Sequence, residues 1–347
     1  MKRTRWVLPF LIGLALAVLA GPLAPSAIAA TAQATPAASP EASPASGGQG
    51  IAAATAWLIS QQGEDGSFLG FSGEPDAGTT VDALLSLAAA KEAGVDVGSA
   101  IDDALSYLAS SDIALVYTQT GVGQSAKFTL VLIAVGQDPA NFANVSPLMI
   151  LDHGLNPETG IYGSGLYDHA LSILALVAAG KDVPTEAIDA IAQTQAENGG
   201  WAFDGSTDDA AVDSNTTSIV LQALVAAGQG EGDVVTKGVG YLESVSTDKG
   251  ATYDLTEGAS PDANSTAVVI QGLLATGNDA TALLAALGTF QNADGSFFYN
   301  AETPGANLIA TVQAIPALAE VAFPIQPASA FMAPVLAFTP ATLPRAA

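Results

Sequence analysis

The sequence predicts an all-α protein, an (α/α)6 toroid of about six two-helix repeats and therefore about twelve helices. Three observations predict this fold. A glycine turn recurs with a fixed internal spacing, and an Ala-, Leu- and Val-rich stretch follows each clear copy of the turn. No window shows the sustained alternation of apolar and polar residues that indicates β-strands.

The recurring turn has the form Gln-x3-Gly-x-aromatic. Its clear copies are QGEDGSF at 62–68, QAENGGW at 195–201 and QNADGSF at 291–297. A degenerate copy at 156–162 begins with Asn, and another precedes Gly250. Because the glycine-containing turn lies between apolar stretches, we expect it to join two helices of one repeat.

A second pattern, Asp-x3-Thr, opens the apolar stretch after three of the turns, at 76–80, 213–217 and 262–266. Aspartate is a good N-cap, since its carboxylate accepts hydrogen bonds from the free N–H groups of the first turn. Glycine ends four of the stretches and suits the left-handed residue that follows a helix. These helices are apolar on nearly every side, so we expect both faces to be covered.

The glycines that end successive stretches are 44, 48 and 49 residues apart (Gly136, Gly180, Gly228, Gly277). A period in this range with two helices and a loop is typical of helical-hairpin arrays. The predicted repeats are centred near 57–90, 101–136, 148–180, 187–228, 238–277 and 283–320. No polar capping repeat is found at either end, so closure of residues 51–321 into a ring is favoured over an open solenoid.

The two ends of the chain have a different composition. Residues 1–30 are predicted to be an export signal, with a basic start, an apolar run at 6–19 and a small-residue cleavage site at 27–29; an uncleaved anchor is the alternative. Residues 31–50 are rich in Pro, Ala and Ser and predict a disordered linker. The apolar tail at 322–347 contains five prolines, and it either packs along the toroid or docks a partner.

These features predict a secreted or cell-surface protein with no transmembrane segment after signal cleavage. Loss of the three signal cations leaves 6 Lys and Arg against 34 Asp and Glu, a formal charge of −28. Such a field disfavours nucleic acid as a partner. The chain contains no cysteine, which excludes thiol nucleophiles and thiolate-bound metals.

The Gln-x3-Gly-x-aromatic turns resemble the QW-type repeats of squalene–hopene and terpenoid cyclases. The whole pattern resembles the prenyltransferase/squalene-oxidase repeat of the terpenoid cyclase/protein prenyltransferase α/α-toroid superfamily, over the entire mature domain. The same toroid serves cobalamin carriers and thioester domains of complement-like proteins. The resemblance therefore implies the fold and leaves the function open.

The sequence departs from the catalytic patterns of that superfamily. In the cyclases the second Asp of D-x-D-D-T-A donates the proton, and the matching residues here are Asn215 and Asn264. A carboxamide is not a general acid. The zinc of the protein prenyltransferases needs a cysteine, as does a thioester. The resemblance thus implies a toroid without the cyclase acid or the zinc site.

The loops between paired helices are expected to gather at one end of the ring and to bring aromatic side chains there. We expect a stacking rim over a central cavity. The alternative is that the rings fill gaps between repeats, above all those at the repeat position itself. The rim aromatics are Phe68, Phe71, Tyr162, Tyr167, Trp201, Phe203, Tyr253, Phe297, Phe298 and Tyr299.

Acidic and histidine residues supply further candidates. Asp204, Asp208 and Asp209 are weak candidates for a calcium site, although loop and cap roles explain such acids equally well. Two carboxylates in this region at a fixed separation would suit glycoside hydrolysis. His153 and His169 are candidates for a ligand or a base, against a surface or capping role.

We therefore predict an exported binding or surface-interaction module whose partner is a small hydrophobic or ring-bearing ligand, or an envelope protein. A terpenoid-cyclase or prenyltransferase-type enzyme and a glycan-active enzyme are the alternatives. No cofactor is expected, with calcium and a corrinoid left open. The residues expected at the cavity mouth are Tyr162, Tyr167, His169, Trp201, Phe203, Asp213, Asn215, Asp262, Asn264, Phe298 and Tyr299.

Overall fold

The computed structural model describes residues 47–325, so the predicted signal peptide, most of the linker and most of the tail lie outside the described residues. The helices are α1 (Gly47–Ser60), α2 (Ala77–Glu92), α3 (Ala100–Ala109), α4 (Ile113–Gln119), α5 (Val122–Ala134), α6 (Pro147–Asp152), α7 (Leu166–Ala178), α8 (Thr185–Gln193), α9 (Ser214–Ala226), α10 (Asp233–Ser244), α11 (Ala263–Ala275), α12 (Thr281–Gly288) and α13 (Leu308–Leu318).

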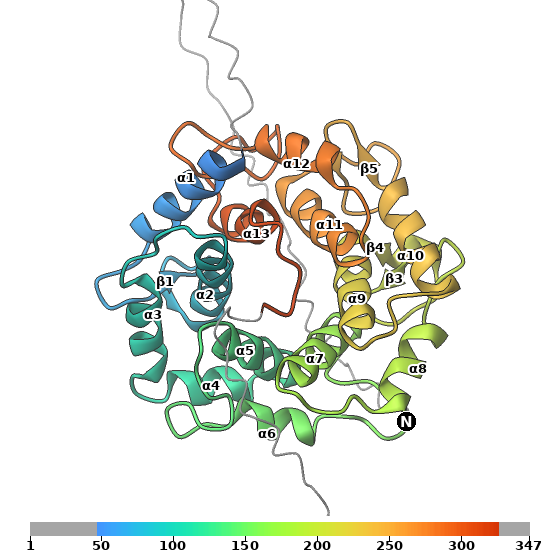
Figure 1. Cartoon of the computed structure of the whole chain (residues 1–347), viewed down its shortest axis with the longest axis horizontal. Helices are drawn as coiled ribbons and strands as arrows, with labels where there is room; N and C mark the ends of the chain where they lie inside the picture. Colours follow the sequence, from blue (N-terminus) through green and yellow to red (C-terminus); the bar gives the residue numbers. More distant parts are fainter. Residues whose placement is uncertain (1–46, 326–347) are drawn as a thin grey trace, which may run out of the picture. The chain divides into compact units, whose positions relative to one another are not determined.

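Six helices form an inner ring. α2, α5, α7, α9, α11 and α13 pack side by side in this order, and α13 packs back against α2 to close the ring (Figure 1). The remaining helices pack around the outside, with α10, for example, lying against both α9 and α11. The all-α toroid of six repeats is therefore confirmed, with the repeats at the predicted places.

The described residues contain thirteen α-helices where about twelve were expected. The additional helix comes from the second repeat, whose outer segment is divided into α3 and α4. The division falls at Ser111, which has a left-handed backbone with φ 51°. A residue in this conformation ends a helix, so the chain must start a new one at Ile113.

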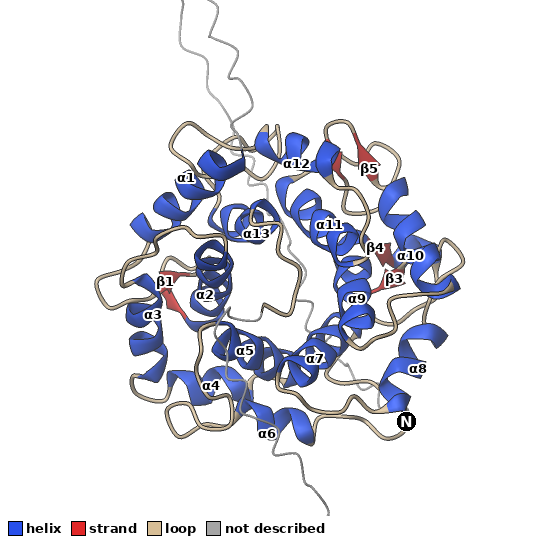
Figure 2. Cartoon of the chain, viewed as in Figure 1, coloured by secondary structure: helices blue, strands red, loops and turns tan. Residues whose placement is uncertain are grey.

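Short two-residue strands in the connecting loops were not expected from the sequence (Figure 2). They form three antiparallel ribbons: β1 (Phe68–Leu69) with β2 (Pro75–Asp76), β3 (Trp201–Ala202) with β4 (Val212–Asp213), and β5 (Ser246–Thr247) with β6 (Gly250–Ala251). A 3-10 turn, η1 (Asp209–Ala211), precedes β4. In the first two ribbons the repeat aromatic pairs with the capping aspartate, Phe68 with Asp76 and Trp201 with Asp213.

The Asp-x3-Thr pattern has two structural roles. The aspartates cap the inner helices as predicted; Asp213 Oδ1, for example, accepts a hydrogen bond of 2.7 Å from the Thr216 N–H. The threonine four residues after the cap holds the preceding turn, because its Oγ1 accepts from the N–H of the residue at the repeat position, which is Phe68, Trp201 or Ala251. This bond is 2.9 Å from Trp201 to Thr217. The spacing of the pattern thus ties each turn to the start of its inner helix.

The glutamine of each clear turn connects neighbouring repeats. Its Nε2 donates to the carbonyl of the turn glycine and to a carbonyl in the outer helix of the next repeat, at 3.0 and 2.9 Å for Gln62, 2.7 and 2.8 Å for Gln195, and 3.1 and 2.8 Å for Gln291. For Gln291 the next repeat is the first one, since the bond reaches Gly50 in α1. The same hydrogen bond that links consecutive repeats therefore also closes the ring.

The segment after α13 turns into the opening of the ring (Figure 1). Gln271 Nε2 of α11 donates to the Val321 carbonyl at 3.1 Å, and the Phe323 N–H donates to Gln222 Oε1 of α9 at 2.8 Å. Ile325 is buried. The described start of the tail thus packs on the inner ring, and residues 326–347 lie outside the described part. No helix within residues 47–325 has the length and apolarity to cross a bilayer.

Candidate functional site

The inner helices leave one face toward the middle of the ring, because the outer helices cover the other. Side chains two and six residues after the N-cap lie about one turn apart on one face, and they are partly exposed on several inner helices. We call the end of the ring where the inner helices begin the mouth. Tyr167, Asn215 and Asn264 occupy the first of these positions on α7, α9 and α11.

One side of the mouth contains an ion pair between two inner helices. Lys127 Nζ of α5 lies 2.7 Å from Asp82 Oδ1 of α2, at equivalent positions six residues after the two N-caps. Burial opposes the lysine charge, but the Asp82 carboxylate and the Tyr117 and Tyr167 hydroxyls outweigh it and raise the pKa of Lys127. Lys127 is therefore charged and largely neutralised by Asp82.

The other side of the mouth contains three aromatic residues, Phe203, Tyr253 and Tyr299, which we call the aromatic arc. Each lies two residues after the repeat position of its turn, and its carbonyl accepts a hydrogen bond from the first N–H of the preceding inner helix. These bonds are 2.7 Å to α7, 2.8 Å to α9 and 2.8 Å to α11. The arc thus places one aromatic residue beside the start of each of three consecutive inner helices.

The arc residues remain accessible. Phe203 is 49% exposed and Tyr253 is 47% exposed, while Tyr299 is half-buried. Sequence reasoning placed Tyr253 among the rim aromatics but not among the expected ligand residues. The structure places Ala251 at the repeat position of this degenerate turn, because its N–H donates to Thr266 Oγ1 as the Trp201 N–H does to Thr217. Tyr253 thus has the same register, two residues further on, as Phe203 and Tyr299.

Two buried aspartates lie beside the arc. Burial raises the pKa of Asp213 to about 6; hydrogen bonds from Thr216 and the Asn215 N–H oppose this shift, and the Asp254 carboxylate adds to it. Burial also raises the pKa of Asp262. These carboxyl groups cap α9 and α11, and burial holds the pKa of Asp213 well above that of an ordinary aspartate.

Replacing Asp213 by Asn tests this shift. The folded-state pKa of Asp213 is about 6, above the ordinary value of 3.8, so the folded state holds the proton more tightly and stability falls as pH rises from about 4 to 6. Asparagine is an equally good N-cap. We expect D213N to raise the free energy of unfolding at pH 8 by about 3 kcal/mol, with no gain at pH 4. Urea denaturation of both proteins across this range measures the difference, and an equal change at both pH values would contradict it.

Three expected ligand residues lie in the packing between repeats and not at the mouth. Trp201 and His169 are fully buried and Tyr162 is 3% exposed. The Trp201 indole N–H donates to the Ile191 carbonyl at 2.8 Å. Phe68 and Phe297, at the same repeat position as Trp201, are also fully buried. The structure thus supports the alternative that these rings fill gaps between repeats.

His169 replaces the threonine of the repeat pattern. Its Nδ1 accepts from the Tyr162 N–H at 3.0 Å, and its Nε2 donates to the Ala187 carbonyl at 2.8 Å. Burial lowers the pKa of His169, although the Ala187 hydrogen bond opposes the shift. Both ring nitrogens are therefore occupied within the protein. His153 is exposed and bonds to the Met149 carbonyl, separate from His169.

H169T tests this structural role. A histidine whose folded pKa lies below 6.5 loses folded-state stability as pH falls below that value, because the unfolded chain binds the proton more readily. We expect the wild type to lose about 1–2 kcal/mol relative to H169T between pH 7 and 5. Denaturation midpoints at several pH values measure it. The readout is this pH-dependent difference, which a cavity left by the smaller side chain does not produce.

The remaining candidate residues, Phe298 and the three aspartates of the predicted calcium site, do not form one site. Phe298 is half-buried and packs on Phe290 with the ring centroids 5.4 Å apart. Asp204 and Asp208 accept hydrogen bonds from backbone N–H groups two residues further on, and Asp209 accepts from Asn198. The structure does not bring these aspartates together as a calcium site, and no group of three such ligands occurs in the described part of the chain.

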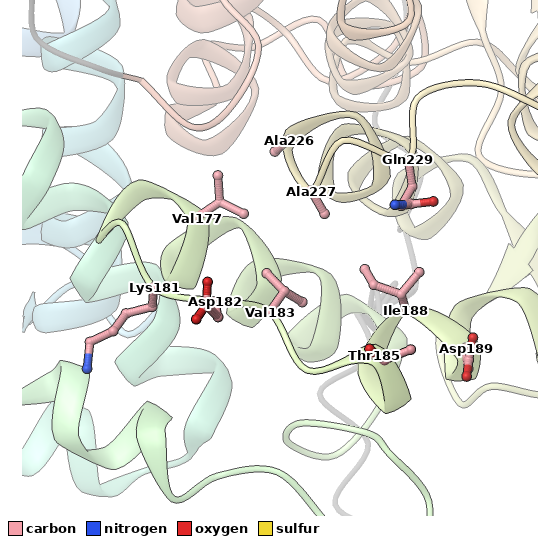
Figure 3. A pocket seen from close by; sticks show the side chains of 10 residues that line it. All are labelled: Val177, Lys181, Asp182, Val183, Thr185, Ile188, Asp189, Ala226, Ala227 and Gln229. Carbon is pink, nitrogen blue, oxygen red and sulfur yellow. The ribbon is translucent and has the colours of Figure 1, made fainter.

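A pocket of about 440 Å³ lies at the opposite end of the inner helices, where α7 and α9 end (Figure 3). It is an open hollow with aliphatic and charged side chains. Sequence reasoning did not find it, because its residues form no repeated pattern. They are Val177, Lys181, Asp182, Val183, Thr185, Ile188, Asp189, Ala226, Ala227 and Gln229.

Comparison with known proteins shows the fold and nothing finer. No family model matches the sequence, and no curated protein sequence matches it. The type II terpene cyclase MstE from Scytonema superposes with a TM-score of 0.56 at 16% identity, over 79% of this chain and 98% of that one.

Two carbohydrate-active enzymes are also similar in structure. The GH76A alpha-1,6-mannanase from Salegentibacter sp. HEL1_6 superposes with a TM-score of 0.61 at 11% identity, over 79% and 98% of the two chains. An unsaturated glucuronyl hydrolase specific for heparin superposes with a TM-score of 0.57 at 12% identity, over 79% of this chain and 95% of that one. The chain is thus an α/α-toroid protein.

Proposed function

We propose that this protein is an exported binding module that takes a small ring-bearing ligand at the mouth of the toroid. The observation that carries the proposal is the aromatic arc. Three accessible aromatic residues are held by the same backbone hydrogen bond beside three consecutive inner helices. Stacking on such aromatic faces gives a flat ring-bearing ligand most of its binding free energy, while polar groups next to the faces fix its orientation.

Asn215 and Asn264 supply polar groups at the required place. They lie at equivalent positions on α9 and α11, two residues after the capping aspartates, and each is partly exposed. A carboxamide both donates and accepts hydrogen bonds. The arc and the two asparagines together match a site with a stacking surface and a few oriented polar contacts.

The same asparagines count against terpenoid cyclisation. One of the structural neighbours is a terpene cyclase, but in this chain Asn215 and Asn264 occupy the proton-donor position of the cyclase motif. No carboxamide protonates an alkene. Binding without cyclisation is therefore the function that these residues support.

Export is part of the proposal and is supported by the sequence alone. The basic start, the apolar run and the small-residue cleavage site precede the toroid, and the acidic chain suits a solvated surface outside the cell.

Native mass spectrometry of the protein isolated from the envelope of its cells tests both parts. We expect a recurring small-molecule adduct on a chain that begins near residue 30. The Y253A/Y299A double variant should lose the adduct, while F71A should keep it, because Phe71 is 85% exposed outside the arc. Loss of the adduct in both variants, or a clean mass for the wild type, would refute the binding function.

Glycoside hydrolysis is the second candidate, and one observation favours it. Asp213, with a pKa of about 6, lies near the Asp254 carboxylate, and a protonated and an ionised carboxyl group together are the machinery of glycosidases. Two structural neighbours are enzymes of carbohydrates. A panel of p-nitrophenyl glycosides tests this: turnover that D213N abolishes without unfolding would support hydrolysis, and no turnover by the wild type would exclude these substrates.

A further inference from the structure

We infer that the ligand of the mouth is an organic ammonium ion that carries N–H donors. The inference rests on the proposed function, because it specifies the chemistry of the ligand at the same site. It follows from the charges around the aromatic arc, from two buried oxygens without a donor, and from the arc itself.

The arc side of the mouth contains no basic residue. The sequence has no Lys, Arg or His from Gly250 to Ile325, nor between Lys181 and Lys237. The helices α9, α11 and α13 therefore bring no cation to the site. Lys237 lies on the outer helix α10 and Lys249 is exposed next to β6, so neither belongs to an inner helix.

The lysine of the inner helix α5 is already paired. Lys127 lies 2.7 Å from Asp82, so this ion pair contributes little net charge to the mouth. The acidic groups Asp213, Asp254 and Asp262, in contrast, have no salt bridge in the described structure.

These acids lie close to the arc. Burial and the carboxylates of Asp213 and Asp254 raise the pKa of Tyr253 to about 12. Burial and Asp262 raise the pKa of Tyr299. The aromatic faces and the negative groups thus share one region, and a negative field over aromatic faces attracts cations both by charge and through the ring quadrupole.

Two side-chain oxygens on neighbouring inner helices lack a hydrogen-bond donor. Asn264 Oδ1 of α11 and Gln313 Oε1 of α13 are buried and have no partner in the described structure. Buried acceptors without a donor are rare in folded proteins. Asn264 lies two residues, and Gln313 six residues, after the N-cap of its helix, which are the positions that face the mouth. Both residues are themselves partly exposed, so rotation of each carboxamide would turn its oxygen toward the mouth. An ammonium group there supplies the missing N–H donors and the missing positive charge together.

Four probes with one ring and different charges test this inference. Benzylammonium, benzyltrimethylammonium, benzyl alcohol and benzoate are titrated into the purified protein by ligand-observed NMR, at low salt and at 0.5 M NaCl. We expect benzylammonium to bind at least tenfold more tightly than benzyl alcohol, benzoate not to bind, and high salt to weaken benzylammonium several-fold. Benzyltrimethylammonium, which has no N–H donor, should bind more weakly than benzylammonium.

Variants assign the effect to the site. Y253A should weaken all probes that bind, and N264L should weaken benzylammonium several-fold while leaving benzyltrimethylammonium within twofold. F71A, which removes an exposed aromatic outside the arc, should change neither. Equal effects of N264L on both cations would refute the role of the unpaired oxygen.

The results separate this inference from the proposed function. If benzyl alcohol or methyl α-mannopyranoside binds as well as benzylammonium, and salt has no effect, the mouth binds neutral rings; the charge inference is then wrong while the binding function stands. If none of these probes and no ligand from the native envelope binds, the binding function itself fails.

Discussion

G295A should destabilise the toroid by about 3 kcal/mol or more. Gly295 has a left-handed backbone with φ 94°, and a Cβ at this position would lie 2.3 Å from the Ala53 carbonyl oxygen. That oxygen belongs to helix α1, so the side chain would push the last turn away from the first helix, where the Gln291 hydrogen bond closes the ring. Urea denaturation followed by circular dichroism measures the loss.

Gly277 is the matched control for this prediction. It also has a left-handed backbone, with φ 73°, but nothing lies within 4 Å of the position of a Cβ. G277A should therefore lower the free energy of unfolding only by the strain of a left-handed alanine backbone, about 1–2 kcal/mol. Equal losses for G277A and G295A would show that the close approach of the turn to the first helix does not stabilise the ring.

The second large effect is expected for W201A, with a loss of about 3–5 kcal/mol. Trp201 is fully buried, its indole donates to Ile191, and its ring is close to Gly238 of the next outer helix. Removing it leaves a cavity between two repeats and an acceptor without its donor. Thermal and urea unfolding measure the loss.

Phe203 provides the control, because it lies only two residues further along the same loop and is 49% exposed. F203A should cost less than about 1 kcal/mol and should weaken ligand binding. W201A examined well below its unfolding transition should still bind. A large binding defect in W201A with little loss of stability would contradict this prediction, because it would show that Trp201 binds the ligand and does not stabilise the packing between repeats.

The fold was predictable because several repeats carry the same interactions. The capping aspartates, the threonine that holds the turn and the glutamine that bridges repeats all lie at fixed spacings, so local patterns report long-range packing. The division between α3 and α4 was not predictable, because nothing in the sequence around Ser111 requires a left-handed residue. The short ribbons were missed for a similar reason, since two paired residues give no alternating pattern.

The candidate site was predictable only in part. Asn215 and Asn264 were found because they follow the capping aspartates, and the structure places both at the mouth level of adjacent helices. Trp201 and Tyr162 were harder to place, because an aromatic residue in a turn suits either stacking on a ligand or filling a gap between repeats. The ion pair of Lys127 with Asp82 joins residues 45 positions apart, and no pattern in the sequence predicts it.

The hydrogen bond from Gln291 to Gly50 spans 241 residues of chain, and this bond has a consequence for folding. Each repeat gains its neighbour as soon as the following repeat is made, but the first repeat gains its second neighbour only when the last repeat is complete. Bringing such distant segments together costs more conformational entropy of loop closure than forming a local helical hairpin. Until then α1 and α2 have surface that α13 and the last turn cover in the complete ring. A chain that lacks its sixth repeat therefore leaves two uncovered ends, and the ring closes only when the C-terminal helices are in place.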